Sequence, residues 1–352
     1  MSKRALNLPQ KIARNHPSWL PALSVFLAAV AVIWLYSFAV PRRDKPLPLQ
    51  AVSSGKSHKT APQSLSDTTE FGQFAPATDA ERELEKMLRG KDEDIDLVLA
   101  NWLIAADIPQ FADMTREAYF AQLDAMTKQV RMEMARMQKV AEGRGQNPGD
   151  PDVRCAIFCN AVIKLRFGYR EEFRGHDVAP ARLKALYSDA NNIFLAGLLR
   201  TRRGSCVSMP LVYLVIGRRF GFPVYLVAVG KHYFIRWEEP GYRMNIETTQ
   251  VDKVWVTDDD LAYVEEEGLT PEQVSGSELR SLTNREVIGT LFFARQGHLT
   301  TRNETQACMD LSRARHLAPD DPAIKATHEA VFTYYGIKPE HRSIESRVRP
   351  KA

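Results

Sequence analysis

Hydrophobic positions in the larger part of the chain recur with the period of a helix. Between Asp79 and Gly90, an acidic first turn precedes Leu84, Met87 and Leu88, which fall on one face. Glycine is common where a helix ends, so Gly90 closes this segment. The same spacing predicts further helices over residues 93–106, 116–141, 153–167, 207–220, 286–296 and 304–317, and a short helix or turn over 191–199.

The spacing changes to that of strands between residues 224 and 247. The runs Val224–Val229, Tyr233–Trp237 and Tyr242–Glu247 are rich in β-branched and aromatic residues. Gly230-Lys231 and Glu238–Gly241 separate these runs and predict turns. A helix that leads into an antiparallel meander indicates the α+β fold class.

The second hairpin has two possible registers. If Glu238–Gly241 forms a four-residue loop, His232 lies directly opposite Glu247. If Pro240-Gly241 forms a two-residue turn, His232 lies opposite Thr249 instead. The pattern of the strands alone leaves both registers open.

One apolar segment stands apart from these elements. Trp19–Val40 contains 22 residues without a charge, long enough to span a bilayer of about 30 Å as a helix. Ser37-Phe38-Ala39 resembles a signal-peptide cleavage site, but the run exceeds the usual signal length, so we expect a retained single-pass anchor. The short, purely basic N-terminal tail favours an extracytoplasmic position for the main body.

These changes of pattern divide the chain into seven expected segments. They are a basic tail over 1–18, a transmembrane helix over 19–40, a Pro- and Ser-rich flexible linker over 41–78, a helical lead-in over 79–145, an α+β core over 150–265, C-terminal helices over 276–335 and a basic tail over 336–352. Among the C-terminal helices, the spacing of Ala307, Leu311, Ala314 and Pro319 resembles the second helix of a tetratricopeptide repeat. A single such unit is too small for a solenoid, so these helices pack on the core or bind a protein partner.

Composition and charge exclude several classes of protein. Apolar residues make up 44% and charged residues 26% of the chain, as in globular proteins. The net charge of +4 is too small to indicate a nucleic-acid partner. Four cysteines without paired Cys or Cys/His spacing predict neither a disulfide framework nor a metal site, and no cofactor is expected.

A cysteine, a histidine and a carboxylate form the candidate catalytic group. Cys206 stands at the predicted start of the 207–220 helix. Proline fits only in the first turn of a helix, so Pro210 places the helix start at or just before Cys206. A helix N-terminus favours a thiolate. His232 at the start of a strand is the candidate base, and Glu247 on the next strand is the candidate orienting acid. Asn245 shares a face with Glu247 in either register and is the reserve orienting residue.

Three polar residues near the cysteine have a weaker claim to a role. Asn192 and its neighbour Asn191 are candidates to donate a hydrogen bond to an oxyanion, although a role in a turn is the more common one for asparagine. Ser205 is more typical of a helix cap than of a catalytic group.

The residues around the candidate group resemble a known family. GSCVSMPLVYLVIGRRFGFPVYLV and HYFIRWEEPGYRMNIETT are similar to the transglutaminase-like superfamily, with its papain-like fold. EDIDLVLANWLIAADIPQFADMTREAYFAQLDAM and SDANNIFLAGLLRTRRGSC resemble the lead-in of its bacterial branch. The resemblance covers about Asp92–Thr249 and implies that Cys206 is the nucleophile, His232 the base and Glu247 the orienting acid. The chain departs from the usual pattern by carrying Glu where Asp is common.

Three functions are compatible with this sequence. The first is a membrane-anchored, cysteine-dependent amide hydrolase or acyltransferase of the protease, deamidase or transglutaminase type, acting on a protein or peptide. The second is a catalytically inactive scaffold of the same family that binds proteins beside a membrane. The third is a structural anchor whose globular part serves assembly.

Overall fold

The computed structural model describes residues 76–170, 173, 180–230, 232–249, 255–266, 274, 278–300 and 302–335. The predicted span Trp19–Val40, the linker and both basic tails lie outside this range, apart from the last residues of the linker. Within these described ranges, every helix is too short or too polar to cross a bilayer. In chain order the elements are α2 (Asp79–Leu88), η1 (Asp92–Asp94), α3 (Leu97–Ala106), η2 (Pro109–Phe111), α4 (Arg116–Gly143), α5 (Pro151–Ile163), β1 (Gly168–Tyr169), α6 (Pro180–Ser188), η4 (Ala190–Asn192), α7 (Leu195–Thr201), β2 (Arg203–Gly204), α8 (Met209–Arg219), β3 (Val224–Val229), β4 (His232–Glu239), β5 (Tyr242–Glu247), β6 (Trp255–Thr257), α9 (Leu261–Glu266), α10 (Asn284–Leu299), α11 (Glu304–Leu317) and α12 (Pro322–Tyr334).

Side-chain caps determine where several of these helices begin. Thr78 accepts a hydrogen bond from the Glu81 amide at the start of α2, and Thr115 caps α4 in the same way. The helix expected from residue 93 begins at Leu97 instead, because the Asp96 side chain accepts from two amides of the first turn. The residues ahead of it form the short η1 turn. Local capping chemistry therefore moves this boundary by four residues.

The sheet is a four-stranded antiparallel meander in the order β3-β4-β5-β6, which agrees with the α+β class. Glu239 pairs with Tyr242, so β4 and β5 are joined by the two-residue turn Pro240-Gly241, and the four-residue loop is wrong. Gly241 has a φ of 78°, a conformation that suits the position after proline in a type II turn. The edge strand β6 is too short to show a pattern and was not predicted.

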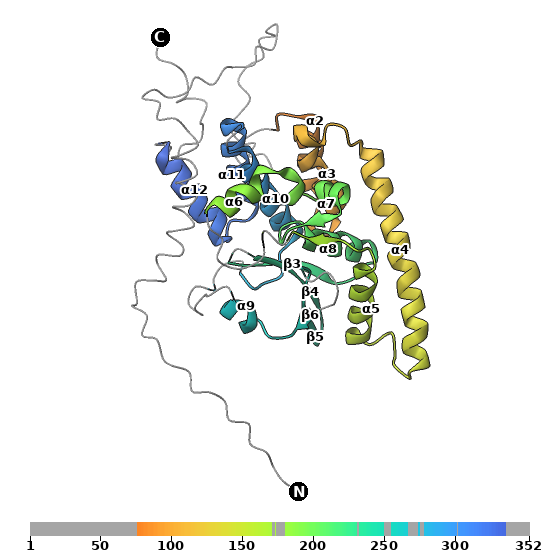
Figure 1. Cartoon of the computed structure of the whole chain (residues 1–352). Helices are drawn as coiled ribbons and strands as arrows, with labels where there is room; N and C mark the ends of the chain where they lie inside the picture. Colours follow the sequence, from red (N-terminus) through yellow and green to blue (C-terminus); the bar gives the residue numbers. More distant parts are fainter. Residues whose placement is uncertain are drawn as a thin grey trace, which may run out of the picture.

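The two faces of the sheet pack against different elements. Leu226, Ile235, Trp237 and Ile246 face the helices and belong to the main hydrophobic core. Residues of the opposite face, Val227, Val229 and Phe234, form a second cluster with Tyr263 of α9. This separation follows from the alternation of side chains along a strand. In Figure 1, α4 and α5 lie along one edge of the molecule, and α9 lies apart from the other helices, at the lower left.

The C-terminal helices contribute to the same core as the sheet. Val287, Ile288, Leu291 and Phe292 of α10 are buried in the main cluster, so α10 packs on the body of the protein. The connection between α10 and α11 is the four-residue segment 300–303, because α10 continues three residues beyond the helix expected over 286–296. A third helix, α12, follows, which the sequence analysis did not predict.

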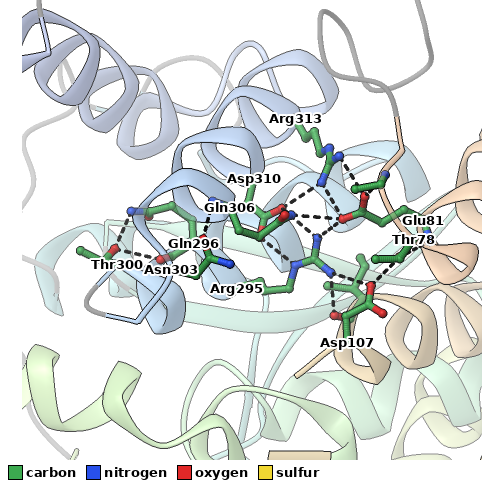
Figure 2. A network of polar contacts seen from close by, with 12 residues as sticks. Thr78, Glu81, Asp107, Arg295, Gln296, Thr300, Asn303, Gln306, Asp310 and Arg313 are labelled. Atoms are coloured by element: carbon green, nitrogen blue, oxygen red, sulfur yellow. Dashed lines mark hydrogen bonds and ion pairs between the residues drawn. The ribbon is translucent and has the colours of Figure 1, made fainter. Parts of the chain in front are cut away.

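A buried network of charges joins the first described helix to α10 and α11 (Figure 2). The carboxylate of Glu81 accepts hydrogen bonds from Arg295 at 2.8 Å and from Arg313 at 2.7 Å. Arg295 also donates to both carboxylate oxygens of Asp310, at 2.7 and 2.8 Å. The side chains of both arginines and both acids are at most 2% exposed. Two positive and two negative charges thus balance inside the protein and link residues more than 200 positions apart.

Candidate active site

Cys206 lies in the turn between β2 and α8. The helix begins at Met209, three residues later than expected, with Pro210 as its second residue. The prediction of a helix start at Cys206 is therefore wrong, although the Met209 amide already donates to the Ser205 carbonyl. The thiol is partly exposed and stands just ahead of the positive end of the α8 dipole.

Two buried serines hold the turn that carries Cys206. The hydroxyls of Ser205 and Ser208 both donate to the carbonyl oxygen of Asn192, at 2.7 and 2.8 Å. The Ser208 hydroxyl also accepts from the Ser205 amide, and the Ser205 hydroxyl accepts from the Val207 amide. Both serines are fully buried. The turn is therefore fixed on both sides of the cysteine, so the thiol has a defined position.

Asn192 contributes to the site through its backbone. Its side-chain Nδ2 donates to the Leu186 carbonyl at 3.1 Å, and the residue is 3% exposed. Its carbonyl anchors the two serines, as just described. This arrangement corresponds to the structural role weighed for Asn192, and donation to an oxyanion remains a prediction.

His232 and Glu247 meet on the face of the sheet that carries Tyr263. The imidazole Nε2 lies 2.7 Å from the Glu247 Oε2. A carboxylate only accepts hydrogen bonds, so Nε2 carries the proton in this contact. Cys206 also interacts with this imidazole, and its side-chain hydrogen bond contributes to raising the pKa of His232. The three residues thus form a chain from thiol to imidazole to carboxylate.

His232 contacts Glu247 although the strand pairing places Thr249, and not Glu247, directly opposite His232. Ile235 pairs with Ile246, and continuing this register brings Thr249 opposite His232. The two hairpin registers differ by two residues, which leaves every side chain on its original face. Glu247 is then a diagonal neighbour of His232, at a spacing that a long side chain can bridge. The extra methylene of Glu, compared with the Asp usual in the family, suits this diagonal position.

Thr249 holds the second oxygen of the Glu247 carboxylate. Its amide donates to Oε1 at 2.8 Å, and its hydroxyl donates to the same oxygen at 2.6 Å. Thr249 is 8% exposed and Glu247 9% exposed. Sequence reasoning considered Thr249 only as an alternative pairing partner of His232, because a role that depends on the register has no signal in the sequence.

Asn245 takes part in a neighbouring network instead of contacting the histidine. Its Oδ1 accepts from Arg236, and its Nδ2 donates to Asp260, both at 2.8 Å. Asp260 also pairs with Arg236 at 2.7 Å and with Arg243 at 3.0 Å. These contacts tie β4 and β5 to the segment that leads into α9. Tyr263 of α9 stacks on Phe234, with ring centroids 4.0 Å apart.

The electrostatics of the site favour the charged forms of both His232 and Glu247. Burial alone lowers the pKa of His232, but its contacts with Cys206 and Glu247 outweigh this effect and raise the pKa well above its usual value. Burial raises the pKa of Glu247, but hydrogen bonds from His232 and Thr249 and the charge of His232 lower it overall. A protonated His232 beside an ionised Glu247 is therefore the stable arrangement near neutral pH. In the residues that the structure describes, no group of His, Cys, Asp and Glu is arranged to hold a metal ion.

Comparison with known protein families shows to which family this chain belongs. A family model described as "Transglutaminase-like superfamily" matches residues 117–292, half of the 352 residues. The chain belongs to the transglutaminase-like superfamily. No curated protein and no solved structure matches it.

The extent of this transglutaminase-like match encloses the whole candidate site. It begins in α4, ends in α10 and includes Cys206, His232 and Glu247. The match begins later than the resemblance seen in the sequence, which covered about Asp92–Thr249, and ends later, so that it includes residues 276–292 of the helical segment expected over 276–335. Helices α2, α3, α11 and α12 lie outside the match, although each of them contributes residues to the main core.

Replacing Glu247 with Gln tests the electrostatic coupling in the site. The amide has nearly the same shape but no charge, so it removes an interaction that raises the pKa of His232. We expect the pKa of His232 to fall, as measured by NMR titration of the imidazole protons. A histidine whose pKa is raised on folding stabilises the folded protein below its unfolded pKa, about 6.5, and this stabilisation is lost as the pH rises through the folded pKa. The free energy of unfolding of the variant should therefore fall mainly at low pH.

His298 provides the internal control for this titration. Its pKa is lowered, first by burial, and its Nδ1 contacts the Tyr187 carbonyl at 2.9 Å, away from Glu247. The pKa of His298 should not change in the Glu247→Gln variant. An unchanged pKa for His232 would contradict the proposed coupling.

Proposed function

We propose that this protein is a cysteine-dependent hydrolase or acyltransferase that acts on amide bonds of proteins or peptides. Cys206 is the nucleophile, His232 the base and Glu247 the acid that orients the imidazole. The observation that carries the proposal is the 2.7 Å contact between His232 and Glu247, with Cys206 hydrogen-bonded to the same imidazole. Membership of the transglutaminase-like superfamily supports it.

The reaction would proceed through an acyl-enzyme. The Cys206 thiolate attacks the carbonyl carbon of the amide, and the C–N bond then breaks as a C–S bond remains. The protonated His232 gives its proton to the leaving nitrogen, which departs as an amine or ammonia. In the second half, neutral His232 takes a proton from water or from an acceptor amine, which attacks the thioester; the C–S bond breaks and the Cys206 thiolate is released beside the protonated imidazole. Hydrolysis, deamidation and crosslinking differ only in the amide attacked and in the acceptor.

The position of this chemistry is part of the proposal. We infer that Trp19–Val40 anchors the chain in a membrane as a single span, and that residues 41–78 connect it to the body, on the extracytoplasmic side. The amide substrate would then be found near a membrane surface. The helices over 276–335 are a candidate surface for a protein partner.

Alkylation of the four cysteines across pH tests the nucleophile. The full-length chain is treated with iodoacetamide between pH 5 and 9, and mass spectrometry gives the rate at each cysteine. Cys308 is the matched control because it is partly exposed, as Cys206 is, whereas Cys155 and Cys159 are buried. We expect Cys206 to react at least about tenfold faster than Cys308 at pH 6, because an imidazolium stabilises a thiolate beside it.

The same measurement distinguishes the two main functions. A Cys206 that reacts no faster than Cys308 below pH 7 would contradict the catalytic proposal. It would instead favour the alternative that the protein is an inactive transglutaminase-like scaffold for protein–protein contacts beside a membrane.

A further inference from the structure

The carboxylate of Glu247 accepts hydrogen bonds on both of its oxygens, and one residue supplies two of them. Oε2 lies 2.7 Å from the Nε2 of His232. Oε1 accepts from the amide of Thr249 at 2.8 Å and from its hydroxyl at 2.6 Å. A hydroxyl that donates to an ionised carboxylate lies about 2.5–2.7 Å from the oxygen. The hydroxyl of Thr249 therefore makes a charge-assisted hydrogen bond to an ionised Glu247.

The end of β5 makes the amide of Thr249 available for this contact. β5 ends at Glu247, which is also its last residue to pair with β6, opposite Trp255. The chain bends at Thr249, and its amide donates to a side chain. A hydrogen bond from an amide to an acidic side chain two residues earlier is typical of turns. The contact thus follows from the way the strand ends.

A glutamate in this position needs to be held in place. Its carboxylate turns about one more bond than that of aspartate, and glutamate is among the side chains that lose the most conformational freedom when they become ordered. Glu247 and Thr249 are both buried. Water therefore has little access to Oε1, and Thr249 supplies the hydrogen bonds that fix it.

The same hydrogen bonds stabilise the charge of Glu247. Burial raises the pKa of this carboxyl group, but the contacts with His232 and Thr249 lower it overall. Burial lowers the pKa of His232, and the ionised Glu247 is among the contacts that raise it overall. Among the described residues, the hydroxyl of Thr249 donates only to Glu247. Its effect on the imidazole therefore passes through the carboxylate.

We propose that Thr249 is a positioning residue of the candidate catalytic group, whose amide and hydroxyl hold the Glu247 carboxylate in the orientation in which Oε2 meets His232. The inference rests on the proposed function and adds a fourth residue to Cys206, His232 and Glu247. It also gives a reason why a glutamate serves where aspartate is common in the family, because Thr249 fixes the end of the longer side chain.

Thr249→Val in the full-length chain tests this role. Valine keeps the β-branched shape and the amide but removes the hydroxyl. We expect the rate of Cys206 alkylation by iodoacetamide at pH 6 to fall about fivefold, the effect of losing one ordinary hydrogen bond. The pKa of His232, followed by NMR titration, should fall as well. If the valine variant does not fold, Thr249→Ala also lacks the hydroxyl and gives the same comparison.

Two further variants separate positioning from a general effect on the fold. Thr249→Ser restores the hydroxyl and should recover most of the rate lost in Thr249→Val. Thr248→Val is the matched control, because Thr248 is also buried but its hydroxyl has no hydrogen-bond partner in the described part of the chain. It should leave the Cys206 rate and the pKa of His232 unchanged. An equal loss of rate in Thr248→Val and Thr249→Val would overturn the proposal.

A double-mutant cycle with Glu247→Gln tests whether Thr249 acts through the carboxylate. Glutamine carries no charge for the hydroxyl to stabilise. Adding Thr249→Val to Glu247→Gln should therefore change the pKa of His232 much less than Thr249→Val alone does. Equal changes in the two backgrounds would mean that Thr249 affects the imidazole by another route, and the assigned role would be wrong.

The outcomes separate this inference from the proposed function. If wild-type Cys206 reacts faster than Cys308 and folded Thr249→Val reacts at the wild-type rate, Thr249 is not a positioning residue and the catalytic proposal stands. If wild-type Cys206 reacts no faster than Cys308, the proposed function fails, and the role of Thr249 fails with it.

Discussion

The His232→Ala variant should lower the rate of Cys206 alkylation at pH 6 by about 100-fold. His232 is the only imidazole that contacts Cys206 among the interactions of the described residues, and its protonated form stabilises a thiolate there. An ordinary thiol ionises near pH 8.5, so at pH 6 less than about 1% of it is thiolate. Without the imidazole, alkylation should follow this ordinary profile and approach the wild-type rate only near pH 9.

Two controls support the interpretation of this result. His316→Ala removes an exposed histidine of α11 and should leave the Cys206 profile unchanged. The rate at Cys308 in His232→Ala should equal that of the wild type. A Cys206 profile that does not move toward higher pH in His232→Ala would exclude His232 as the base.

The Glu81→Gln variant should reduce the free energy of unfolding by about 3–5 kcal/mol at pH 7. The carboxylate of Glu81 lies between Arg295 and Arg313, all nearly inaccessible to solvent. Glutamine keeps the size of the side chain but removes one of the two buried negative charges, so Arg295 and Arg313 must share Asp310 as their remaining buried acidic partner. A buried ion pair is not strongly stabilising relative to apolar residues, but removing one member is costly because the other remains desolvated. Urea denaturation measures the change.

Glu83 on the same helix provides the matched control. It pairs with Arg116 at 3.0 Å, and both side chains are more than 40% exposed. Water and salt screen such a pair, so Glu83→Gln should cost less than about 1 kcal/mol. Equal effects of the two substitutions would show that the buried network is not a major source of stability.

The direction of the Glu81 pKa sets the pH range of this effect. Burial raises this pKa, but Arg313 and Arg295 together lower it below its usual value. A carboxyl group with a lowered folded pKa stabilises the protein above its unfolded pKa, near 4.3, and loses that contribution as the pH falls through the folded value. The difference in the free energy of unfolding between wild type and Glu81→Gln should therefore reach its maximum by pH 7 and decrease below about pH 4.

The network also joins segments on either side of the family match. Glu81 belongs to α2, ahead of the match, and Arg313 belongs to α11, after it. Because Glu81 bonds to both Arg295 of α10 and Arg313, α2 contributes to holding α10 and α11 against the body.

Local patterns in the sequence predicted the strands around the site well. Val224–Val229 and Tyr242–Glu247 have the predicted bounds, because β-branched and aromatic residues and the adjacent Pro and Gly act within a few positions of the chain. β4 is longer than Tyr233–Trp237 and includes His232 as its first residue. Cys206, His232 and Glu247 were identified from their positions near predicted element ends, the hairpin pairing and the family resemblance.

Details that depend on pairing between elements were harder to predict. The four-residue loop was wrong, yet Glu247 still meets His232, because a shift of two residues retains the face of every side chain. The start of α8 was misplaced because Ser205 and Ser208 bond to the carbonyl of Asn192, which belongs to a different turn. A periodicity analysis contains no information on such contacts.

The sequence by itself determined the α+β class, the order of the main elements and the three residues that form the candidate site, because these follow from local periodicity, turn chemistry and family motifs. Only the tertiary structure decided that Thr249 holds the Glu247 carboxylate, that Glu81 lies between two arginines and that the carbonyl of Asn192 anchors the turn of Cys206. The physical reason is the same in each case. Hydrogen bonds and desolvated charges depend on distances between residues that are remote in sequence or paired in one particular register, and these distances are set only when the chain packs.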